Sequence, residues 1–379
     1  MDTFDTQYFK VNRLLLTFCG LWPFQPPRSG SILLYWAILG ALIIFLPQIA
    51  YIFKYARCLD DLYDVLPSLI GSCICLTKVL GLHCKFKEFQ LLIQHVHNDW
   101  CHLAGHEDIR ILLEYMEPSR VFTLAYSIFV STFAASYITA PITVPIFDII
   151  LASNVTRPKR LPHPSEFFVD QEKYYYYLLM ITYLGYASCV MIAIATDTVY
   201  FALLQHTCGM LAILSHRLEN LVICNRSKCT INHNLVYTSD KDVGHLTQCI
   251  QLQIRIERLV QLVESTFSIC LCAEIGLGML FQCSSCVMIV THTEMMEIMR
   301  NGPLLIIQIS RIFFNSWIGQ RIIDHSSRIP EAAYNGLWYR SSMAMRRMLL
   351  LLILRCQKPY RITTAKLYVI SLEGYSTVR

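Results

Sequence analysis

Long apolar segments alternate with charged segments along most of the chain. Residues 32–53 and 121–147 contain no charged residue, and residues 174–204 contain only Asp197. Residues 62–82 form a fourth segment of similar length. Because a helix needs roughly 20 apolar residues to cross the hydrocarbon of a bilayer, this pattern predicts four membrane spans.

Three further spans are predicted closer to the C-terminus. Residues 259–290 and 303–322 are apolar, although each includes two charged residues. Residues 363–379 are only moderately apolar and, at about 1.5 Å per residue, too short to span completely. The pattern predicts an all-α membrane protein with seven transmembrane helices. Its expected parts are an N-terminal segment (1–30), helices one to six with their loops and extensions (31–326), an anchor helix (327–362) and a short seventh helix (363–379).

Amphipathic segments are predicted outside the bilayer. Residues 203–224 and 245–264 carry apolar side chains at helical spacing, so helices four and five are expected to continue beyond the membrane. The leucine-rich run 348–354 lies between arginines and is too short to cross. It is typical of a packing helix, which Pro359 then ends because proline cannot continue a helix. A helix so apolar must be covered by protein, which favours subunit contacts.

Composition supports a membrane protein and argues against other classes. Of the chain, 54% is hydrophobic and only 16% charged, with a mean hydropathy of +0.43. The net charge of +5 does not favour nucleic acid as a partner, because Lys and Arg lie between apolar runs rather than on one solvated face. Most of the 16 cysteines fall in apolar runs or in segments expected in the cytosol, so buried free thiols are favoured over a disulfide framework.

Positive charge in the connecting segments predicts the orientation. With a cytosolic N-terminus, the inner segments contain 20 Lys and Arg residues and the outer segments contain 6. This imbalance favours a cytoplasmic N-terminus and an extracellular C-terminus. Two glycosylation sequons, at Asn154 and Asn225, lie on opposite sides of the span 174–204, so only one can face the lumen. The orientation predicts Asn154 as the glycosylated residue.

Charged residues inside spans are functional candidates. Lys78, Asp197 and Arg321 are expected near cytoplasmic helix ends, where they can reach water or headgroups. Arg311 and Glu274 are expected deeper, facing a protein interior or an aqueous path. A structural ion pair and a role in coupling a ligand to a pore both remain open for these two.

The chain lacks the motifs of common enzymes and metal sites. Cys283 and Cys286 have CxxC spacing, but small residues in a membrane helix favour packing over redox or metal chemistry. Cys101, His102 and His106 have loose ligand-like spacing without a second cluster to complete a zinc site. No phosphate loop, HExxH helix or GxSxG elbow is present. Neither an enzyme nor a cofactor is predicted.

Two segments near the C-terminus are recognisable. They are "FNSWIGQRIIDHSSRIPEAAYNGLWYR" (314–340), with Gly319-Gln320 and Trp338-Tyr339, and "RCQKPYRITTAKLYVISLE" (355–373). At these residues the chain resembles the insect odorant receptors: the first segment is similar to the family's exit from helix six, and the second to its link into helix seven. The resemblance runs through nearly the whole chain and is densest at the C-terminus, and residues 16–23 and 203–221 agree as well.

The resemblance implies an odorant-gated, non-selective cation channel of inverted topology. It implies a tetramer whose cytoplasmic extensions form a central anchor, and whose last helix lines the pore. It further implies a ligand-tuning subunit that works with a shared co-receptor in the plasma membrane of olfactory sensory neurons, in contact with lipid. The implied anchor residues are Tyr334, Trp338, Tyr339, Leu350 and Pro359. The implied pore or gating residues are Thr363, Lys366, Val369, Ser371 and Glu373.

An odorant is a small, volatile, mostly apolar molecule, so its pocket should be apolar with few polar groups. The resemblance places it among the outer halves of helices two, three, four and six. Tyrosines are favoured there, because a hydroxyl in the bilayer needs a partner. For every candidate, helix packing or lipid contact is the competing interpretation. The candidates are Leu66, Ile70, Phe133, Tyr137, Ile138, Tyr177, Met180, Tyr183, Leu184 and Ile307.

Family members usually continue for about another helical turn beyond the point where this chain stops, at Arg379. A shortened isoform, an incomplete gene model and a subunit that leaves gating to its partner all fit this difference. Two alternatives to an odorant-gated channel also remain open. A G-protein-coupled receptor requires the opposite orientation and the Asp-Arg-Tyr and Asn-Pro-x-x-Tyr motifs, which this chain lacks. A gustatory-type receptor shares the fold but differs in ligands and assembly.

Overall fold

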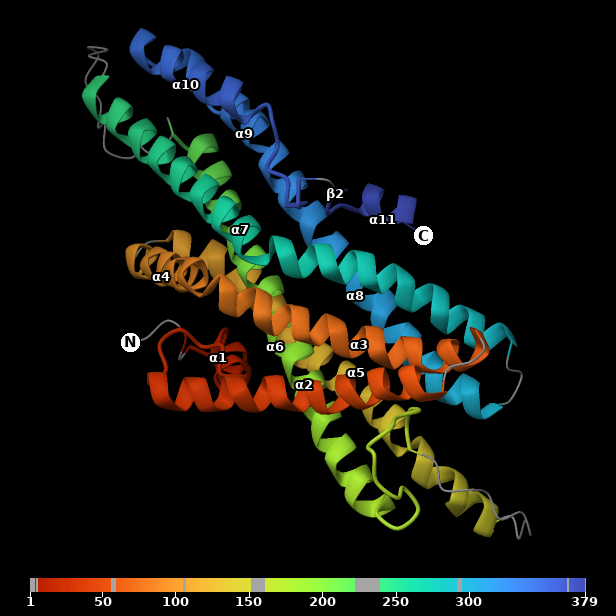
Figure 1. The fold of residues 1–379 in the computed structure, drawn as a ribbon. Coiled ribbons are helices and arrows are strands. Elements are labelled where there is room, and N and C mark those ends of the chain that lie inside the picture. The colour runs from red at the N-terminus through yellow and green to blue at the C-terminus, as the bar shows by residue number, and fades with distance from the viewer. Residues whose placement is uncertain are drawn as a thin grey trace.

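The computed structural model describes residues 4, 6–55, 59–104, 107–150, 161–221, 239–291, 295–366 and 368–378. It is built almost entirely from helices (Figure 1). The first half contains α1 (Lys10–Phe18), α2 (Pro27–Tyr55), α3 (Leu59–Cys84), α4 (Phe86–Leu103), α5 (Asp108–Ile150) and α6 (Tyr175–Glu219). The second half contains α7 (Ser239–Thr291), α8 (Met295–Ser327), α9 (Ile329–Asn335), the 3₁₀ turn η3 (Trp338–Arg340), α10 (Met343–Cys356), strands β1 (Thr363–Thr364) and β2 (Tyr368–Val369), and α11 (Leu372–Val378).

Five helices within the described residues are long and apolar enough to cross a membrane. They occupy Pro27–Tyr55, Leu62–Cys84, Asp108–Thr139, Tyr175–Glu219 and Val243–Val290. These contain, or largely overlap, the first five spans predicted from the sequence. The sixth predicted span lies in α8, where Arg311 and Arg321 interrupt the apolar run.

Helix α6 forms the centre of the bundle. It packs against α2, α3, α5, α7 and α8 (Figure 1). Nearly every side chain between residues 192 and 214 is buried. No face of the helix meets water in this stretch, and polar side chains such as Gln205 and His206 are buried together with the apolar ones. The functional groups described below therefore surround α6.

Helices α6 and α7 extend well beyond the thickness of a membrane. Helix α7 has 53 residues, or about 80 Å at 1.5 Å per residue, whereas the hydrocarbon core measures about 30 Å. The start of α7 lies at the same end of the molecule as α10, at the top of Figure 1, and opposite the start of α6. The helical continuation predicted for residues 203–224 is confirmed as far as Glu219, where α6 ends, and the one predicted for residues 245–264 is confirmed.

The leucine run forms α10, as predicted. Ser342 caps its N-terminus by accepting a hydrogen bond from the Met345 amide. One face packs on α7 and α9, and Gln253 of α7 donates a hydrogen bond to the sulfur of Cys356 at 3.0 Å. The opposite face leaves three leucines more than half exposed within this chain: Leu350, Leu351 and Leu354.

The C-terminal segment corrects one prediction. A helix was expected from Thr363 onward, but α11 begins only at Leu372. The residues between form a small antiparallel hairpin in which Thr363 pairs with Val369 and Thr364 with Tyr368. Its turn places Ala365 and Lys366 at φ values of 50° and 59°, a left-handed conformation that interrupts a helix.

Candidate functional site

An apolar cavity of about 120 Å³ lies between six helices, α2, α3, α5, α6, α7 and α8. Aliphatic and aromatic side chains form most of its wall, among them Ile44, Val130 and Phe281. An engineered cavity of about 150 Å³ can hold a molecule of the size of benzene. The cavity therefore has room for a small organic molecule with few polar atoms.

A hydrogen-bond network of aromatic and hydroxyl side chains lies on one part of the wall. The Tyr186 hydroxyl lies 2.8 Å from Ser68 Oγ, 3.2 Å from the Tyr137 hydroxyl and 3.0 Å from His163 Nδ1. Tyr137 donates in turn to the carbonyl oxygen of Pro162 at 3.3 Å. The network joins α3, α5, α6 and the segment that precedes α6, so it fixes this end of the cavity.

Four charged side chains form a buried cluster beside the cavity. Lys78 comes from α3, Asp197 from α6, Glu274 from α7 and Arg311 from α8, and none is more than 10% exposed. Arg311 also lines the cavity itself. With two positive and two negative groups, the cluster has no net formal charge, which reduces the cost of burying ions in an apolar interior.

The ion pairs in this cluster cross between the helices. Lys78 Nζ contacts Asp197 and lies 3.0 Å from Glu274 Oε2. Arg311 Nε lies 3.1 Å from Asp197 Oδ2, and its Nη2 lies 3.1 Å from Glu274 Oε1. The Tyr126 hydroxyl of α5 donates to Asp197 Oδ2 at 2.8 Å. The cluster thus connects five helices at one level of the bundle.

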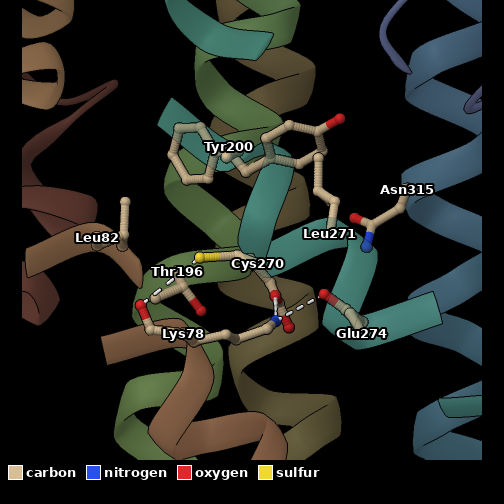
Figure 2. A pocket seen from close by; sticks show the side chains of 10 residues that line it. Lys78, Leu82, Thr196, Tyr200, Cys270, Leu271, Glu274 and Asn315 are labelled. Carbon is tan, nitrogen blue, oxygen red and sulfur yellow. Dashed lines mark hydrogen bonds and ion pairs between the residues drawn. The ribbon is translucent and has the colours of Figure 1, made fainter. Parts of the chain in front are cut away.

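A second, much smaller cavity borders the cluster on another side. It measures about 10 Å³ and is lined by Lys78, Glu274, Tyr200 and Asn315, among others (Figure 2). In Figure 2 the Lys78 side chain reaches toward Glu274, and Tyr200 lies above them. A space of this size holds about one water molecule, so it is too small for an organic ligand.

The structure corrects two predictions about the charged residues. Lys78 and Asp197 were expected near helix ends in contact with water or headgroups, but they are buried in the cluster. The reason is that α6 continues far beyond the predicted span, which leaves Asp197 in its middle. Arg311 and Glu274 form an ion pair with each other, which is one of the two interpretations left open by the sequence. Arg321 is half-buried, with its guanidinium over the rings of Tyr115 and Trp317.

Three of the ten predicted odorant-binding residues line the cavity: Tyr137, Ile138 and Ile307. Leu66 and Ile70 lie next to it, packed in a cluster with Phe281 and Leu304, which do line it. Phe133 is half-buried, and its ring centroid lies 4.7 Å from that of Phe129.

The other four predicted residues lie on α6 outside the cavity wall. Tyr177 and Met180 are each 72% exposed and Leu184 is 46% exposed, so all three point away from the bundle within this chain. Tyr183 is half-buried. Sequence reasoning missed Tyr186, Ser68 and Gln308, all of which line the cavity. The polar character of Ser68 and Gln308 inside apolar helices is a signal that could have found them.

The predicted anchor residues lie at the junction of α9, η3 and α10. Tyr334, Tyr339 and Leu350 are each more than half exposed, and the Trp338 ring packs between the two tyrosines at 6.0 and 6.2 Å. Pro359 follows α10 and is half-buried. These exposed aromatic and aliphatic side chains form an apolar surface at this end of the chain.

The predicted pore residues divide between two elements. Thr363, Lys366 and Val369 belong to the hairpin, whereas Ser371 precedes α11 and Glu373 lies in its first turn. Glu264 of α7 accepts hydrogen bonds from both the amide and the hydroxyl of Thr363. The hairpin is therefore fixed to α7 at its first strand.

The remaining positions considered in the sequence include free cysteines and residues that lie outside the described ranges. Cys283 and Cys286 are exposed free cysteines. Within the described ranges, no group of three or more His, Cys, Asp or Glu side chains is arranged to hold a metal ion. His106, Asn154 and Asn225 lie outside the described residues.

Comparison with known structures supports the fold. The chain matches the insect olfactory receptor OR5 from Machilis hrabei, solved in complex with eugenol, with a TM-score of 0.79 at 12% sequence identity. The match covers 97% of this chain and 93% of the other. The predicted fold class, an all-α membrane protein with seven transmembrane helices, is confirmed.

Sequence comparison gives the family. The chain is 23% identical to odorant receptor Or2 of Anopheles gambiae over 296 residues, which is 76% of this chain and 73% of that protein. It is 31% identical to the odorant receptor coreceptor of Aedes aegypti over only 74 residues, or 20% of this chain. The family model "7tm Odorant receptor" matches residues 59–379. This is a family of receptors rather than enzymes, and the chain belongs to it as an odorant receptor distinct from the coreceptor.

Proposed function

We propose that this chain is the ligand-tuning subunit of an odorant-gated, non-selective cation channel and that the odorant binds in the apolar cavity. The observation that carries the proposal is the cavity itself, which lies among six helices and borders the buried charge cluster. A small apolar ligand there contacts all the helices that must move relative to one another. The relative of the same fold that was solved with eugenol supports a small organic ligand.

A ligand opens a channel only if it binds the open state more tightly than the closed state. Helix α8 offers a direct mechanical route for this coupling. Ile307 and Arg311 line the cavity, and Gly319, about 12 Å beyond Arg311 at 1.5 Å per residue, packs against Ile370. A shift of α8 at the cavity is therefore transmitted to the segment that leads into α11.

The C-terminal hairpin and α11 are the proposed pore and gating segment, with Thr363, Lys366, Val369, Ser371 and Glu373 as the residues that affect conduction. Two anchors support this assignment. The Leu372 amide donates to Gln320 Oε1 of α8 at 3.4 Å, and the Phe313 and Tyr375 rings pack at 5.8 Å. The segment is thus connected to the same helix that lines the cavity.

The proposed assembly is a tetramer with a co-receptor in the plasma membrane of olfactory sensory neurons. The exposed leucines of α10, together with Tyr334 and Tyr339, supply an apolar surface suited to subunit contacts. Similarity to several odorant receptor coreceptors supports a related subunit as the partner. The exposed apolar side chains of α2 and α6 are suited to lipid. The excess of Lys and Arg in the inner segments supports a cytoplasmic N-terminus and an extracellular C-terminus.

Filling the cavity tests the proposal. Ala134 lines the cavity, whereas its neighbour Ala135 faces outward. The Ala134→Phe variant is expected to raise the odorant concentration for half-maximal current by at least about tenfold, equivalent to about 1.4 kcal/mol. Ala135→Phe is the matched control and should leave the response unchanged at equal surface abundance. An Ala134→Phe channel with an unaltered concentration–response curve would show that the odorant binds elsewhere.

A further inference from the structure

The polar side chains that line the cavity differ in whether they have partners within the protein. The hydroxyls of Tyr137, Tyr186 and Ser68 are committed to one another or to nearby acceptors. Ser72 donates to the Leu69 carbonyl, and Cys75 donates to the Cys189 carbonyl. These groups have no need of a ligand to satisfy their hydrogen bonds.

Gln308 is different. Its side chain is 3% exposed and lines the cavity, and its Nε2 has no hydrogen-bond partner in the described part of the chain. Its Oε1 accepts from Arg311 Nη1 at 3.4 Å, which fixes the orientation of the amide and leaves the donor side uncommitted. Gly278 of α7 provides the space for this amide, because a Cβ there would lie 2.3 Å from Nε2.

An unsatisfied buried donor is costly. The cost is removed when a ligand supplies an acceptor atom. Because Gln308 lines the cavity beside Arg311 of the charge cluster, an oxygen of a ligand bound in the cavity is close enough to serve as the acceptor for this amide. Apolar atoms of the same ligand then fill the space along Ile307 and Val130.

The charge of the surroundings limits what that acceptor can be. Lys78 and Arg311 already balance Asp197 and Glu274. An ionised carboxylate or an ammonium group on the ligand would add a buried charge with no counter-ion, which is strongly unfavourable. An alcohol oxygen can accept a hydrogen bond from Gln308, but the alcohol's own O–H group then needs a hydrogen-bond acceptor close to Gln308.

We propose that Gln308 Nε2 is a recognition donor for a neutral carbonyl or ether oxygen, so that the cavity favours small ketones, aldehydes and esters over hydrocarbons, acids and amines. This inference rests on the proposed function and adds the ligand class to it. The size of the cavity, about 120 Å³, indicates molecules of roughly the dimensions of benzene.

Shape-matched probes separate the acceptor from the apolar body. 2-Hexanone and 2-methyl-1-hexene have the same skeleton, but only the ketone carries an acceptor. In cells expressing this chain with a co-receptor, the ketone should activate at a concentration at least about tenfold lower than the alkene, and hexanoate should be no better than the alkene. The same comparison is made for methyl ketones one and two carbons longer, each against its alkene.

Variants on α8 assign the preference to Gln308. Gln308→Met keeps a side chain of similar length without the donor and should reduce the ketone–alkene ratio to within about threefold, mainly by weakening the response to the ketone. Ile309→Met is the matched control, because Ile309 is the next residue on α8 and is 40% exposed outside the cavity wall. It should retain the full ratio.

The outcomes distinguish the inference from the function on which it rests. If alkenes activate as well as ketones, or if Gln308→Met weakens both equally, the recognition role of Gln308 is wrong while the cavity remains an odorant site. If neither class of probe evokes current from complexes present at the cell surface, both the inference and the proposed function are contradicted.

Discussion

Gly319 of α8 lies against Ile370 so closely that a Cβ atom at residue 319 would be 2.4 Å from the Ile370 carbonyl oxygen. The contact joins the helix that lines the cavity to the segment that leads into α11. Only glycine allows this approach. The atom that a Cβ would meet is a backbone oxygen, which cannot move aside as the end of a flexible side chain can. The glycine therefore serves close packing between two elements that the proposed gating mechanism couples.

The first prediction concerns this contact. Gly319→Ala is expected to push Ile370 away from α8 at a cost of about 1–3 kcal/mol, the usual range for overpacking. This weakens the coupling and should reduce the maximal odorant-evoked current by roughly fivefold or more. The measurement is the concentration–response curve at matched surface abundance. Gly276→Ala on α7 is the control, since a Cβ there meets nothing within 4 Å. Equal currents in the two variants would contradict the coupling role.

The second prediction concerns the buried charge cluster. Lys78→Met leaves Asp197 and Glu274 in excess over Arg311 and should destabilise the fold by about 3–5 kcal/mol. Adding Glu274→Gln restores neutrality, so the double variant should be less destabilised than the sum of the two single variants by about 1 kcal/mol or more. Thermal unfolding of the detergent-solubilised chain and surface abundance report the effect. If the destabilisation of the double variant equalled the sum of the two single variants, Lys78 and Glu274 would not be energetically coupled in the cluster.

The third prediction concerns pH. His325 lies in the last turn of α8, outside the predicted span, and burial together with Arg321 and Arg328 lowers its pKa from 6.5 to about 4, although Asp324 acts in the opposite direction. Between these two pKa values the unfolded chain binds a proton that the folded chain does not, so stability falls as pH decreases through that window.

The measurement for His325 is the unfolding temperature at about pH 7.5 and about pH 5. His325→Gln removes the titrating group and should show a smaller loss of Tm on acidification than the unaltered chain. The Tyr115 ring, whose centroid lies 5.3 Å from that of the imidazole, is retained in both proteins. An identical loss of Tm in the variant would assign the pH dependence to other groups.

The fourth prediction tests the orientation without any ligand. Glycosylation in microsomes is followed by the mobility shift on glycosidase treatment, for the unaltered chain and for Asn154→Gln and Asn225→Gln. A cytosolic N-terminus predicts that only Asn154→Gln abolishes the shift. If only Asn225→Gln abolishes the shift, the spans have the opposite orientation to the predicted one. That orientation, with an extracellular N-terminus, is the one that a G-protein-coupled receptor requires.

Much of the fold could be predicted because spans depend on local composition. The first five spans and the helix over residues 348–354 needed only apolar runs and their breaks. The hairpin before α11 was missed because Ala365 and Lys366 adopt left-handed backbone conformations that neither residue type signals. Its position depends instead on contacts with Glu264 and Gly319 that lie far away in the sequence.

The site was less predictable for a related reason. Residues 174–204 are apolar on every side, so the sequence does not indicate which face of α6 meets the cavity. The sequence favours Tyr177 and Tyr183, whereas the structure places Tyr186 on the cavity wall. Lys78 of α3 pairs with residues of α6 and α7, and Asp197 of α6 pairs with residues of α3 and α8, so no spacing within one helix indicates these pairings.

We expect the chain itself to form part of an odorant-gated channel. This is tested by the current in an inside-out patch excised from cells that express the chain with a co-receptor, with the cytoplasmic face in nucleotide-free solution. Patches from cells with the co-receptor alone are the control. An odorant-evoked cation current that persists without nucleotides and requires this chain is the expected result. Loss of the current on removing nucleotides would contradict it and favour signalling through a G protein.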